Sequence, residues 1–283
     1  MKSLPSDSID LIYIDPPFFC QKDFKNKDGV GFNDSWPSRD AYLNFIRARI
    51  DQCHILLKDT GSLFIHLDQK ASHYIKVELD KIFGENNFIN EIIWSYKTYQ
   101  GKVDQYFPKK HDNIFWYRKN SKEKSFFKLP YCDNYKDTIN FRRWKKYFVM
   151  EKGNPVIKYG KHPTSDSRFD AYLKRWKKEN ARMPKSGEII YRQTGEVITD
   201  VWNIQAIDPK DKKEKLGYLT QKPLALLERI IKSCTMENSV VADFFCGSGT
   251  TLVAAKNLNR KYIGCDINQD AIDITNKRLL RCQ

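Results

Sequence analysis

Short apolar runs alternate with amphipathic stretches over most of the chain. Six of these runs have the length and the β-branched and aromatic content of buried strands. The predicted strands cover residues 10–14, 62–66, 89–96, 113–117, 239–244 and 261–265. A predicted helix begins after the capping Ser38 and carries an apolar stripe of Tyr42, Phe45, Ile46, Ile50 and Cys53; further helices are predicted over 71–83, 222–233, 250–258 and 268–280. Strands that alternate with helices predict an α/β fold with a doubly wound, mostly parallel sheet.

Two features interrupt the regular elements in the N-terminal half. Residues 19–37 are rich in Lys, Asp, Asn and Gly and predict a long loop next to the end of the first strand. Gly61 is expected to end the region of the first helix. A long loop beside a strand end is often part of a functional site, and the alternative is an ordinary surface loop.

Residues 118–185 break the alternation altogether. They hold 20 Lys and Arg, only seven Asp and Glu, and twelve aromatic residues, so nearly all of the net charge of +14 lies there. Basic side chains among aromatic rings suit contacts to phosphates and bases, which favours nucleic acid as a partner. The densest basic positions are Arg142, Arg143, Lys145, Lys146, Lys174, Arg175, Lys177 and Lys178. The alternative is a solvated helix pair whose aromatic residues fill a small core.

Composition narrows the class of protein further. The chain has 283 residues and 41% hydrophobic residues, enough for a sizeable core. No apolar run approaches the roughly 18 residues of a membrane span, and residues 1–5 lack the apolar core of a signal peptide. The seven cysteines form no Cys-x-x-Cys pair, which is typical of reduced thiols in the cytoplasm rather than of a zinc site or disulfides.

The first candidate for chemistry is the tetrapeptide Asp15-Pro16-Pro17-Phe18. Two prolines cannot continue a central strand, so the strand must end at Asp15. A carboxylate, a proline carbonyl and an aromatic ring then project from the strand end. Such a group suits a planar amino group on a nucleobase, because Asp15 and the Pro16 carbonyl can each accept one of its hydrogens while Phe18 stacks on the base. The alternative is a plain strand-end turn. His66, at the end of the second strand, is a weaker candidate of the same kind.

The second candidate lies near the C-terminus. A strand ending at Asp243 leads into the glycine turn Gly247-Ser248-Gly249, a helix opened by Thr250, and a further strand ending at Asp266. This order is typical of a nucleoside site, where glycines let the backbone approach the ligand and the second acid takes ribose hydroxyls. The third glycine of the dinucleotide motif is missing, which favours a ligand without a pyrophosphate.

Together these motifs resemble those of S-adenosylmethionine-dependent DNA amino-methyltransferases of the beta arrangement, in which the catalytic motif precedes the cofactor motif. Asp15 to Phe18 resembles the catalytic tetrapeptide, and residues 243–250 resemble the Asp-Pro-Phe-x-Gly-x-Gly-Thr turn, with Phe244 in place of proline. Thr220-Gln221-Lys222-Pro223 resembles the element that closes over the methionine moiety, and His111-Asp112-Asn113-Ile114 the motif before the target-recognition region. The likeness covers nearly the whole chain outside 118–185.

The resemblance implies a Rossmann-like methyltransferase fold with a catalytic half at 1–117, an inserted basic target-recognition region at 118–202 and a cofactor half at 203–283. It implies methyl transfer from S-adenosylmethionine to adenine N6 in double-stranded DNA, after base flipping, within a restriction-modification system. The implied catalytic residues are Asp15, Pro16, Pro17 and Phe18; the implied cofactor residues are Asp243, Phe245, Gly247, Ser248, Gly249, Thr250, Asp266, Ile267, Thr220 and Lys222. Candidate further partners are a cognate restriction endonuclease and a second copy of the chain, and neither a metal nor a membrane is implied.

Two alternatives to this function stay open, cytosine N4 methylation and an impaired DNA-binding subunit, while cytosine C5 methylation is set aside. Cytosine N4 methylation uses the same amino chemistry, and Ser in place of Asp15 would favour it. Cytosine C5 methylation needs a thiolate, which that family places after proline, and no Pro-Cys pair exists here. A catalytically impaired DNA-binding subunit is the other open alternative, because only nine residues precede the first predicted strand, where family members usually carry a strand and an acidic loop that help to hold the cofactor adenine.

Overall fold

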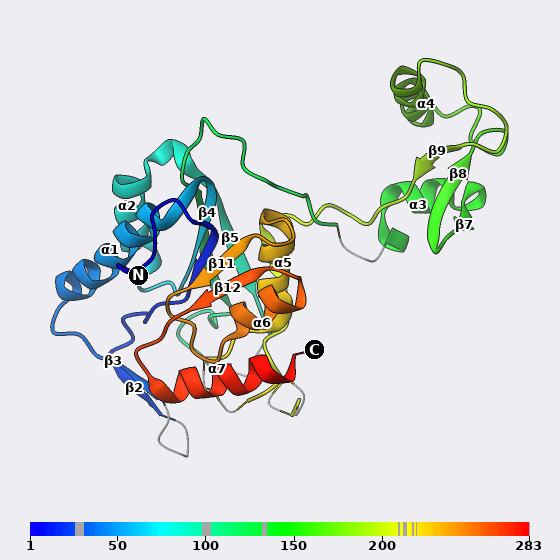
Figure 1. Cartoon of the computed structure of the whole chain (residues 1–283). Helices are drawn as coiled ribbons and strands as arrows, with labels where there is room; N and C mark the ends of the chain where they lie inside the picture. The colour runs from blue at the N-terminus through cyan, green and yellow to red at the C-terminus, as the bar shows by residue number, and fades with distance from the viewer. Residues whose placement is uncertain are drawn as a thin grey trace. The chain divides into compact units, whose positions relative to one another are not determined.

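The structure is a computed structural model, and it describes residues 1–25, 31–97, 103–131, 135–208, 210–211, 214–216, 218 and 220–282. The chain divides into two compact units (Figure 1). Unit 1 comprises Met1–Lys128 and Thr199–Gln283, and unit 2 comprises Leu129–Ile198. In the described part of the chain no helix is long and apolar enough to cross a membrane.

Unit 1 is built on a seven-stranded sheet with the order β10-β5-β6-β4-β1-β11-β12. The strands are β1 (Ile9–Ile14), β4 (Leu57–Leu67), β5 (Phe88–Ser95), β6 (His111–Arg118), β10 (Val201–Asn203), β11 (Val240–Asp243) and β12 (Lys261–Gly264). All neighbouring pairs are parallel except the two made by β6, which runs antiparallel to β4 and β5. In the described residues no helix lies between β5 and β6, so β6 returns in the opposite direction, as expected for a connection without a crossover.

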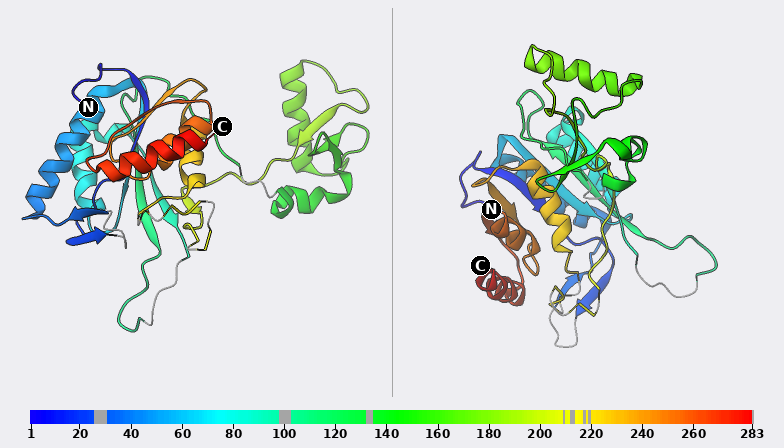
Figure 2. Two further views of the ribbon diagram at one scale, coloured as in Figure 1. Left: turned by 60° about the horizontal axis from the view of Figure 1, so that its bottom comes forward. Right: turned by 90° about the vertical axis from the view of Figure 1, so that its right-hand side faces the viewer.

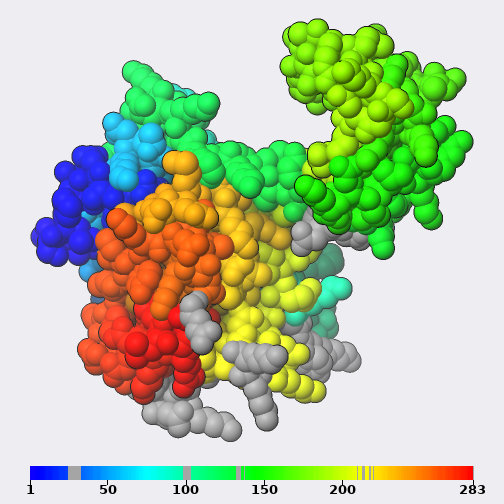
Figure 3. Space-filling view, turned by 45° about the vertical axis from the view of Figure 1, so that its right-hand side comes forward, coloured from blue at the N-terminus to red at the C-terminus, as the bar shows by residue number. Residues whose placement is uncertain are grey.

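Helices cover both faces of this sheet, as Figures 1 and 2 show. On one face lie α1 (Arg39–Leu56) and α2 (Ser72–Phe83), and on the other α5 (Leu224–Cys234), α6 (Thr250–Asn257) and α7 (Gln269–Arg281). Figure 3 shows α5, α6 and α7, in yellow to red, as one continuous face of unit 1. The predicted α/β class and the mostly parallel sheet are therefore confirmed.

The helix stripe predicted after Ser38 is part of the main core. Tyr42, Ile46, Ile50 and Cys53 are fully buried in the cluster that includes β1 and β4, and the Ser38 side chain accepts a hydrogen bond from the amide of Ala41 at the start of α1. An apolar side chain every third or fourth position therefore faces the sheet, as helical periodicity requires.

Two local predictions in the N-terminal half were wrong. The stretch predicted as a loop over 19–37 contains an antiparallel ribbon of β2 (Lys22–Lys25) and β3 (Gly31–Asp34). Gly61 does not end a helix, because β4 begins directly after α1 and Gly61 lies inside it. A Cβ at Gly61 would lie 2.9 Å from the carbonyl oxygen of Lys58 and 3.1 Å from that of Ile9, so glycine is needed where the register between β1 and β4 shifts.

Unit 2 is a small α+β unit. A three-stranded antiparallel sheet of β7 (Val149–Glu151), β8 (Asn154–Lys158) and β9 (Ile189–Arg192) packs with α3 (Ile139–Trp144) and α4 (Ser167–Asn180). Short 3₁₀ turns lie at Glu85–Asn87 in unit 1 and at Tyr135–Asp137 and Lys145–Tyr147 in unit 2. The compact unit is shorter than the predicted insertion of 118–202, because Arg118 ends β6 and Val201–Asn203 pairs with β5.

Candidate active site

A cavity of about 500 Å³ opens in unit 1 where β1 and β11 end. These strands are parallel, so their carboxyl ends meet at one edge of the sheet, the usual ligand-binding edge of an open α/β sheet. Of the fourteen catalytic and cofactor residues predicted from the sequence, all except Gly249 line this cavity. Segments more than 200 residues apart in the sequence therefore form one site.

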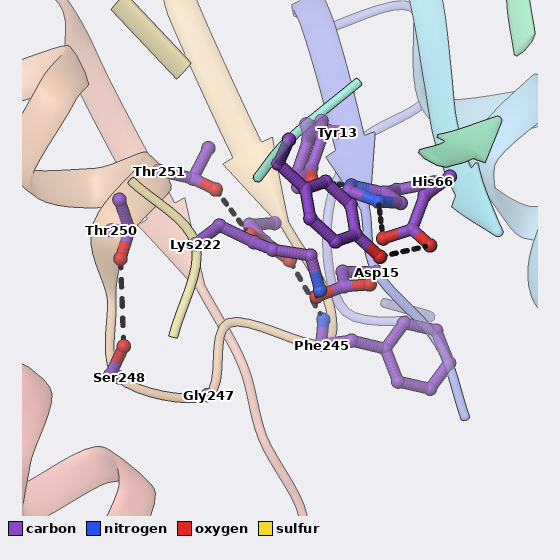
Figure 4. Close-up of polar contacts among 12 residues, drawn as sticks. Tyr13, Asp15, His66, Lys222, Phe245, Gly247, Ser248, Thr250 and Thr251 are labelled. Carbon is purple, nitrogen blue, oxygen red and sulfur yellow. Dashed lines mark hydrogen bonds and ion pairs between the residues drawn. The ribbon is translucent and has the colours of Figure 1, made fainter. Parts of the chain in front are cut away.

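Asp15 follows β1 directly, and its side chain meets that of Lys222 at the wall of the cavity (Figure 4). The Lys222 ammonium donates to Asp15 Oδ2 at 2.5 Å, and both side chains are more than four-fifths buried. Asp15 Oδ1 is also buried, and within the described residues it has no hydrogen-bond partner. The Lys222 nitrogen lies 5.2 Å from the centre of the Phe18 ring as well. One lysine thus contacts two members of the tetrapeptide and leaves one carboxylate oxygen available.

The glycine turn after β11 is held by Asp243. This buried carboxylate accepts the amide of Phe245 at 3.0 Å and the hydroxyl of Thr251 at 2.5 Å. Burial raises the pKa of Asp243 to about 7, because these two hydrogen bonds only partly offset the loss of water around the charge. Gly247 has a φ of +48°, and a Cβ there would lie 3.2 Å from the ring of Tyr218.

Asp266 also binds the turn. Its two carboxylate oxygens accept the amides of Gly247 at 2.8 Å and of Asn268 at 2.9 Å. Each oxygen can accept a second hydrogen, so the ribose contact implied by the resemblance stays chemically open. Ile267 lies at the cavity with a fully exposed side chain.

Gly249 and Thr250 belong to the packing of the turn. Gly249 has a φ of +75°, and a Cβ there would lie 2.6 Å from Thr275 of α7. The Thr250 hydroxyl and the Ser248 carbonyl both accept hydrogens from Arg278, a half-buried residue of α7. Gly249 therefore permits the close approach of α6 and α7, and within this structure it does not face the cavity.

A buried polar network lies behind Phe18. Fully buried His66 contacts the Tyr13 hydroxyl through Nδ1 at 2.7 Å (Figure 4). Its Nε2 contacts Asp112 at 3.1 Å, and Asp112 also accepts the hydroxyl of Tyr96. Burial acts to raise the pKa of Asp112, but its interactions with His66, the hydrogen bond first, outweigh burial and the pKa is lowered. The ring of Phe18 stacks on His66 with centroids 5.9 Å apart. His66 therefore supports Phe18 and is not among the residues that line the cavity.

The two cysteines at the cavity are Cys20 and Cys246. Burial, followed by the charge of Asp34, raises the pKa of the Cys20 thiol to about 11, and burial raises the pKa of the Cys246 thiol further. Both thiols are therefore protonated at neutral pH, and a thiol in this state is a poor nucleophile.

The geometry of the cavity agrees with what comparison with known proteins shows. Residues 9–277 match the family model of a DNA methylase, N6_N4_Mtase. The chain belongs to this DNA methylase family. The predicted resemblance to S-adenosylmethionine-dependent DNA amino-methyltransferases is thereby confirmed.

Similar curated proteins include two methyltransferases and a subunit of a restriction-modification enzyme. The type II methyltransferase M.HpaI of Haemophilus parainfluenzae is 28% identical over 99% of this chain and 70% of its own length. The type III enzyme StyLTI Mod subunit of Salmonella typhimurium is 28% identical over 93% of this chain, which spans half of that subunit. The DNA adenine methyltransferase YhdJ of Escherichia coli is 25% identical over 99% of this chain and 79% of its length.

Solved structures share the fold. The M1.HpyAVI–SAM complex has a TM-score of 0.55 at 20% identity and covers 98% of this chain and 90% of its own. The PvuII DNA methyltransferase, which is cytosine-N4-specific, has a TM-score of 0.58 at 15% identity and covers 98% of this chain and 81% of its own. At these identities the likeness concerns the fold alone.

The eight basic residues predicted to bind nucleic acid lie on α3, α4 and the 3₁₀ turn after α3. All are exposed except Lys177, which is half-buried. The aromatic residues beside them behave differently: Trp144 and Phe169 are fully buried, and Tyr172 and Trp176 pack around them. These rings form the core of unit 2. The prediction that aromatic rings of this segment pack against bases or sugars is therefore wrong for Trp144.

Several residues at the cavity were not predicted from the sequence. The most informative is Asp34, a buried residue of β3 whose carboxylate accepts backbone amides of the segment after Pro17. Other residues at the cavity were not among the predicted site residues: Tyr13, Cys20, Phe24, Asn33, Trp36, Phe45, Tyr218, Leu227, Cys246, Thr251 and Asn268. For Asp34 the sequence offers one hint, an acidic residue next to Asn33 and Ser35 in the segment that was predicted as a loop.

Proposed function

We propose that the chain transfers a methyl group from S-adenosylmethionine to N6 of an adenine in DNA. The observation that carries this proposal is the pair of oxygens on Asp15. One is held by Lys222, while the other is buried with no partner in the described structure, on a residue that lines the cavity. A buried acceptor without a donor is costly, so it marks a place where a ligand hydrogen belongs.

The cavity fits the cofactor that the family uses. A Cβ at Gly247 would lie 3.2 Å from the ring of Tyr218, so glycine lets this ring approach the bare backbone of the turn, and both residues line the cavity. Residues that would hold S-adenosylmethionine are Asp266 for the ribose hydroxyls, Phe245 and Ile267 for the adenine, and Ser248 and Thr220 for the methionine part. When bound, the cofactor supplies a methyl group made electrophilic by its sulfonium charge.

The residues of this chain then orient the acceptor base. Asp15 Oδ1 accepts one hydrogen of the adenine amino group, the carbonyl of Pro16 accepts the other, and the ring of Phe18 stacks on the base. These contacts draw the amino nitrogen toward tetrahedral geometry and expose its lone pair. Lys222 fixes the carboxylate by holding Oδ2. Catalysis by such a site depends mainly on positioning.

Adenine is favoured over cytosine by the residue at the head of the tetrapeptide, where Asp15 stands instead of serine. The name of the YhdJ relative, a DNA adenine methyltransferase, supports the same choice. The protonated thiols of Cys20 and Cys246 offer no nucleophile for attack on cytosine C6.

The proposal extends to partners and place. We propose that the exposed basic residues of α3 and α4 contact DNA phosphates, since basic side chains supply most of the affinity for duplexes. The names of the relatives support a cognate restriction endonuclease as a partner, and a homodimer and a cytoplasmic location are further parts of the proposal.

The test is methyl transfer to duplex DNA from tritiated S-adenosylmethionine, followed by chromatography of the nucleosides. We expect label in N6-methyladenine. Asp15→Ala should lower kcat about a thousandfold while the affinities for cofactor and DNA stay within about threefold, because the hydrogen bond that it removes acts in the transition state. The control is Asp10→Asn at the opposite end of β1, where the carboxylate holds Lys58 and the amide of Val240.

Each contrary result has a defined meaning. Label in N4-methylcytosine would overturn the assignment to adenine. Full activity of Asp15→Ala would overturn the role of the carboxylate. A wild-type protein that binds S-adenosylmethionine and DNA but transfers no methyl group would overturn the proposed activity.

A further inference from the structure

Asp34 is the last residue of β3, in the ribbon that replaces the predicted loop. It is 1% exposed, and its two oxygens accept four N–H groups. Oδ1 accepts the amide of Phe19 at 3.1 Å and the Trp36 indole at 2.8 Å. Oδ2 accepts the amides of Phe18 at 3.1 Å and Cys20 at 2.7 Å. Three of the four donors are thus consecutive backbone amides that begin at Phe18.

The backbone that Asp34 holds is in an unusual conformation. Phe19 has a φ of +59° and Gln21 a φ of +56°. Residues other than glycine rarely adopt this left-handed backbone conformation. Such residues persist only where the surrounding structure holds them in place, and they gather at functional sites. The segment is also tied on its other side, because the Tyr42 hydroxyl donates to the carbonyl of Pro17 at 2.9 Å.

Asp34 and Asp15 use their oxygens in opposite ways. Each oxygen of Asp34 already accepts two hydrogens, which fills the acceptor capacity of a carboxylate, so Asp34 has none left for a substrate. Asp15 keeps one buried oxygen without a partner in the described structure. The two acids lie at the same cavity, and only Asp15 is available for chemistry.

We infer that Asp34 is a positioning residue for methyl transfer: its carboxylate fixes the backbone of Phe18 to Cys20 and thereby sets where the Phe18 ring meets the target base. The inference rests on the proposed function for its effect on the reaction. The β2–β3 ribbon thus stabilises, through Asp34, the left-handed turn that follows the tetrapeptide. An error of about 1 Å in such a group costs on the order of a hundredfold in rate.

Asp34→Asn tests this directly, because the side-chain NH2 would face two N–H donors in place of an acceptor. We expect kcat to fall about a hundredfold, with affinity for S-adenosylmethionine within about threefold of wild type. Hydrogen exchange of a peptide over residues 16–21 should be faster, because the NH2 group replaces one of the two oxygens and leaves one or two of the three backbone amides without an acceptor. Asp10→Asn is the matched control, since it alters another carboxylate that holds a backbone amide in the same unit, and it should change neither kcat nor exchange in this peptide.

Asp34→Glu is the second variant and retains the charge while moving it by one methylene group. If Asp34→Asn does not fold, Asp34→Glu carries the test, with an expected loss of kcat of about tenfold and faster exchange in the same peptide. Exchange at the wild-type rate in the folded variants overturns the inference, whether or not the wild type methylates DNA. An unchanged kcat in both variants also overturns the inference. A loss of kcat that merely equals the loss of folded protein overturns it as well. A wild type without activity overturns the proposed function instead, and the exchange result then decides the inference alone.

Discussion

The two compact units place their charged side chains differently. Unit 2 has sixteen Lys and Arg against eight Asp and Glu in 70 residues, and its predicted DNA-binding side chains are mostly exposed to solvent. Unit 1 has 33 Lys and Arg against 27 Asp and Glu. Several of its acidic side chains lie at the cavity, where they accept hydrogen bonds from backbone amides. Asp34, Asp243 and Asp266 all act in this way.

The difference shows how each kind of charge works. An exposed cation acts on a polyanion through its number and density, so its place in the fold can vary by several ångströms with little effect. A buried carboxylate acts through particular hydrogen bonds, so one atom out of place changes its effect. Unit 2 should therefore tolerate conservative changes of charge, whereas unit 1 should not.

The first comparison of the two units concerns DNA affinity. Replacing Arg142, Arg143, Lys145 and Lys146 by alanine should weaken DNA binding about a hundredfold at low salt and lower the slope of log affinity against log salt by about three to four, because roughly one counterion is released for each phosphate that a basic residue neutralises. Fluorescence anisotropy over a series of salt concentrations measures this slope. Lysine for both arginines is the control and should keep most of it. An unchanged slope in the alanine variant would show that these residues are only solvated.

A second comparison concerns the loss of unfolding free energy when alanine replaces a closely packed glycine of unit 1 or a solvent-facing glycine of unit 2. Gly249 has a φ of +75° and a Cβ would meet Thr275, whereas Gly153 has a φ of +80° with nothing within 4 Å of a Cβ. Both alanine variants carry the cost of a left-handed backbone, about 1–2 kcal/mol. Gly249→Ala should lose a further amount of about 1–3 kcal/mol of unfolding free energy by overpacking. Urea unfolding measures both values, and equal losses would contradict the close approach of α6 and α7.

The most gradual effect is on the pH dependence of stability, because it builds up over about three pH units. Because the pKa of Asp243 is raised to about 7 in the folded state, folded protein keeps a proton that the unfolded chain releases near pH 4. Stability should therefore fall by up to about 1.4 kcal/mol per pH unit between about pH 4 and 7 and then level off. Asp243→Asn should remove this fall, with one amide oxygen still accepting from Phe245.

Glu188 of unit 2 provides the opposite case. Hydrogen bonds from Arg182 and from the amide of Lys185 lower the pKa of Glu188 to about 2. The contribution of the Glu188 carboxylate to the free energy of unfolding is present above a pH of about 4.5 and is lost as the pH falls toward 2. Glu188→Gln should therefore have its full effect on stability only above a pH of about 4.5. Urea titrations at a pH of about 3, 5.5 and 8 distinguish the two acids. The same pH profile for both variants would contradict the contrast between the units.

The sequence by itself determined what depends on neighbouring residues along the chain. Apolar runs indicated the strands, Pro16 and Pro17 ended the first of them after Ile14, and Ser38 capped α1. The glycine turn was recognisable because left-handed backbone at Gly247 and Gly249 favours glycine wherever the turn lies in the fold. The concentration of basic residues needed no structure at all, because net charge is a sum over the sequence.

Only the tertiary structure decided what depends on residues far apart. The pairing of Lys222 with Asp15 joins positions 207 residues apart, and the resemblance had placed Lys222 with the cofactor. The reversal of β6, the burial of Trp144 in the core of unit 2 and the ribbon that brings Asp34 to Phe18 are of the same kind. Local patterns specify backbone conformation, but which donor meets which acceptor is set by how the elements pack, and a carboxylate in the sequence looks the same whether it will hold a backbone or a base.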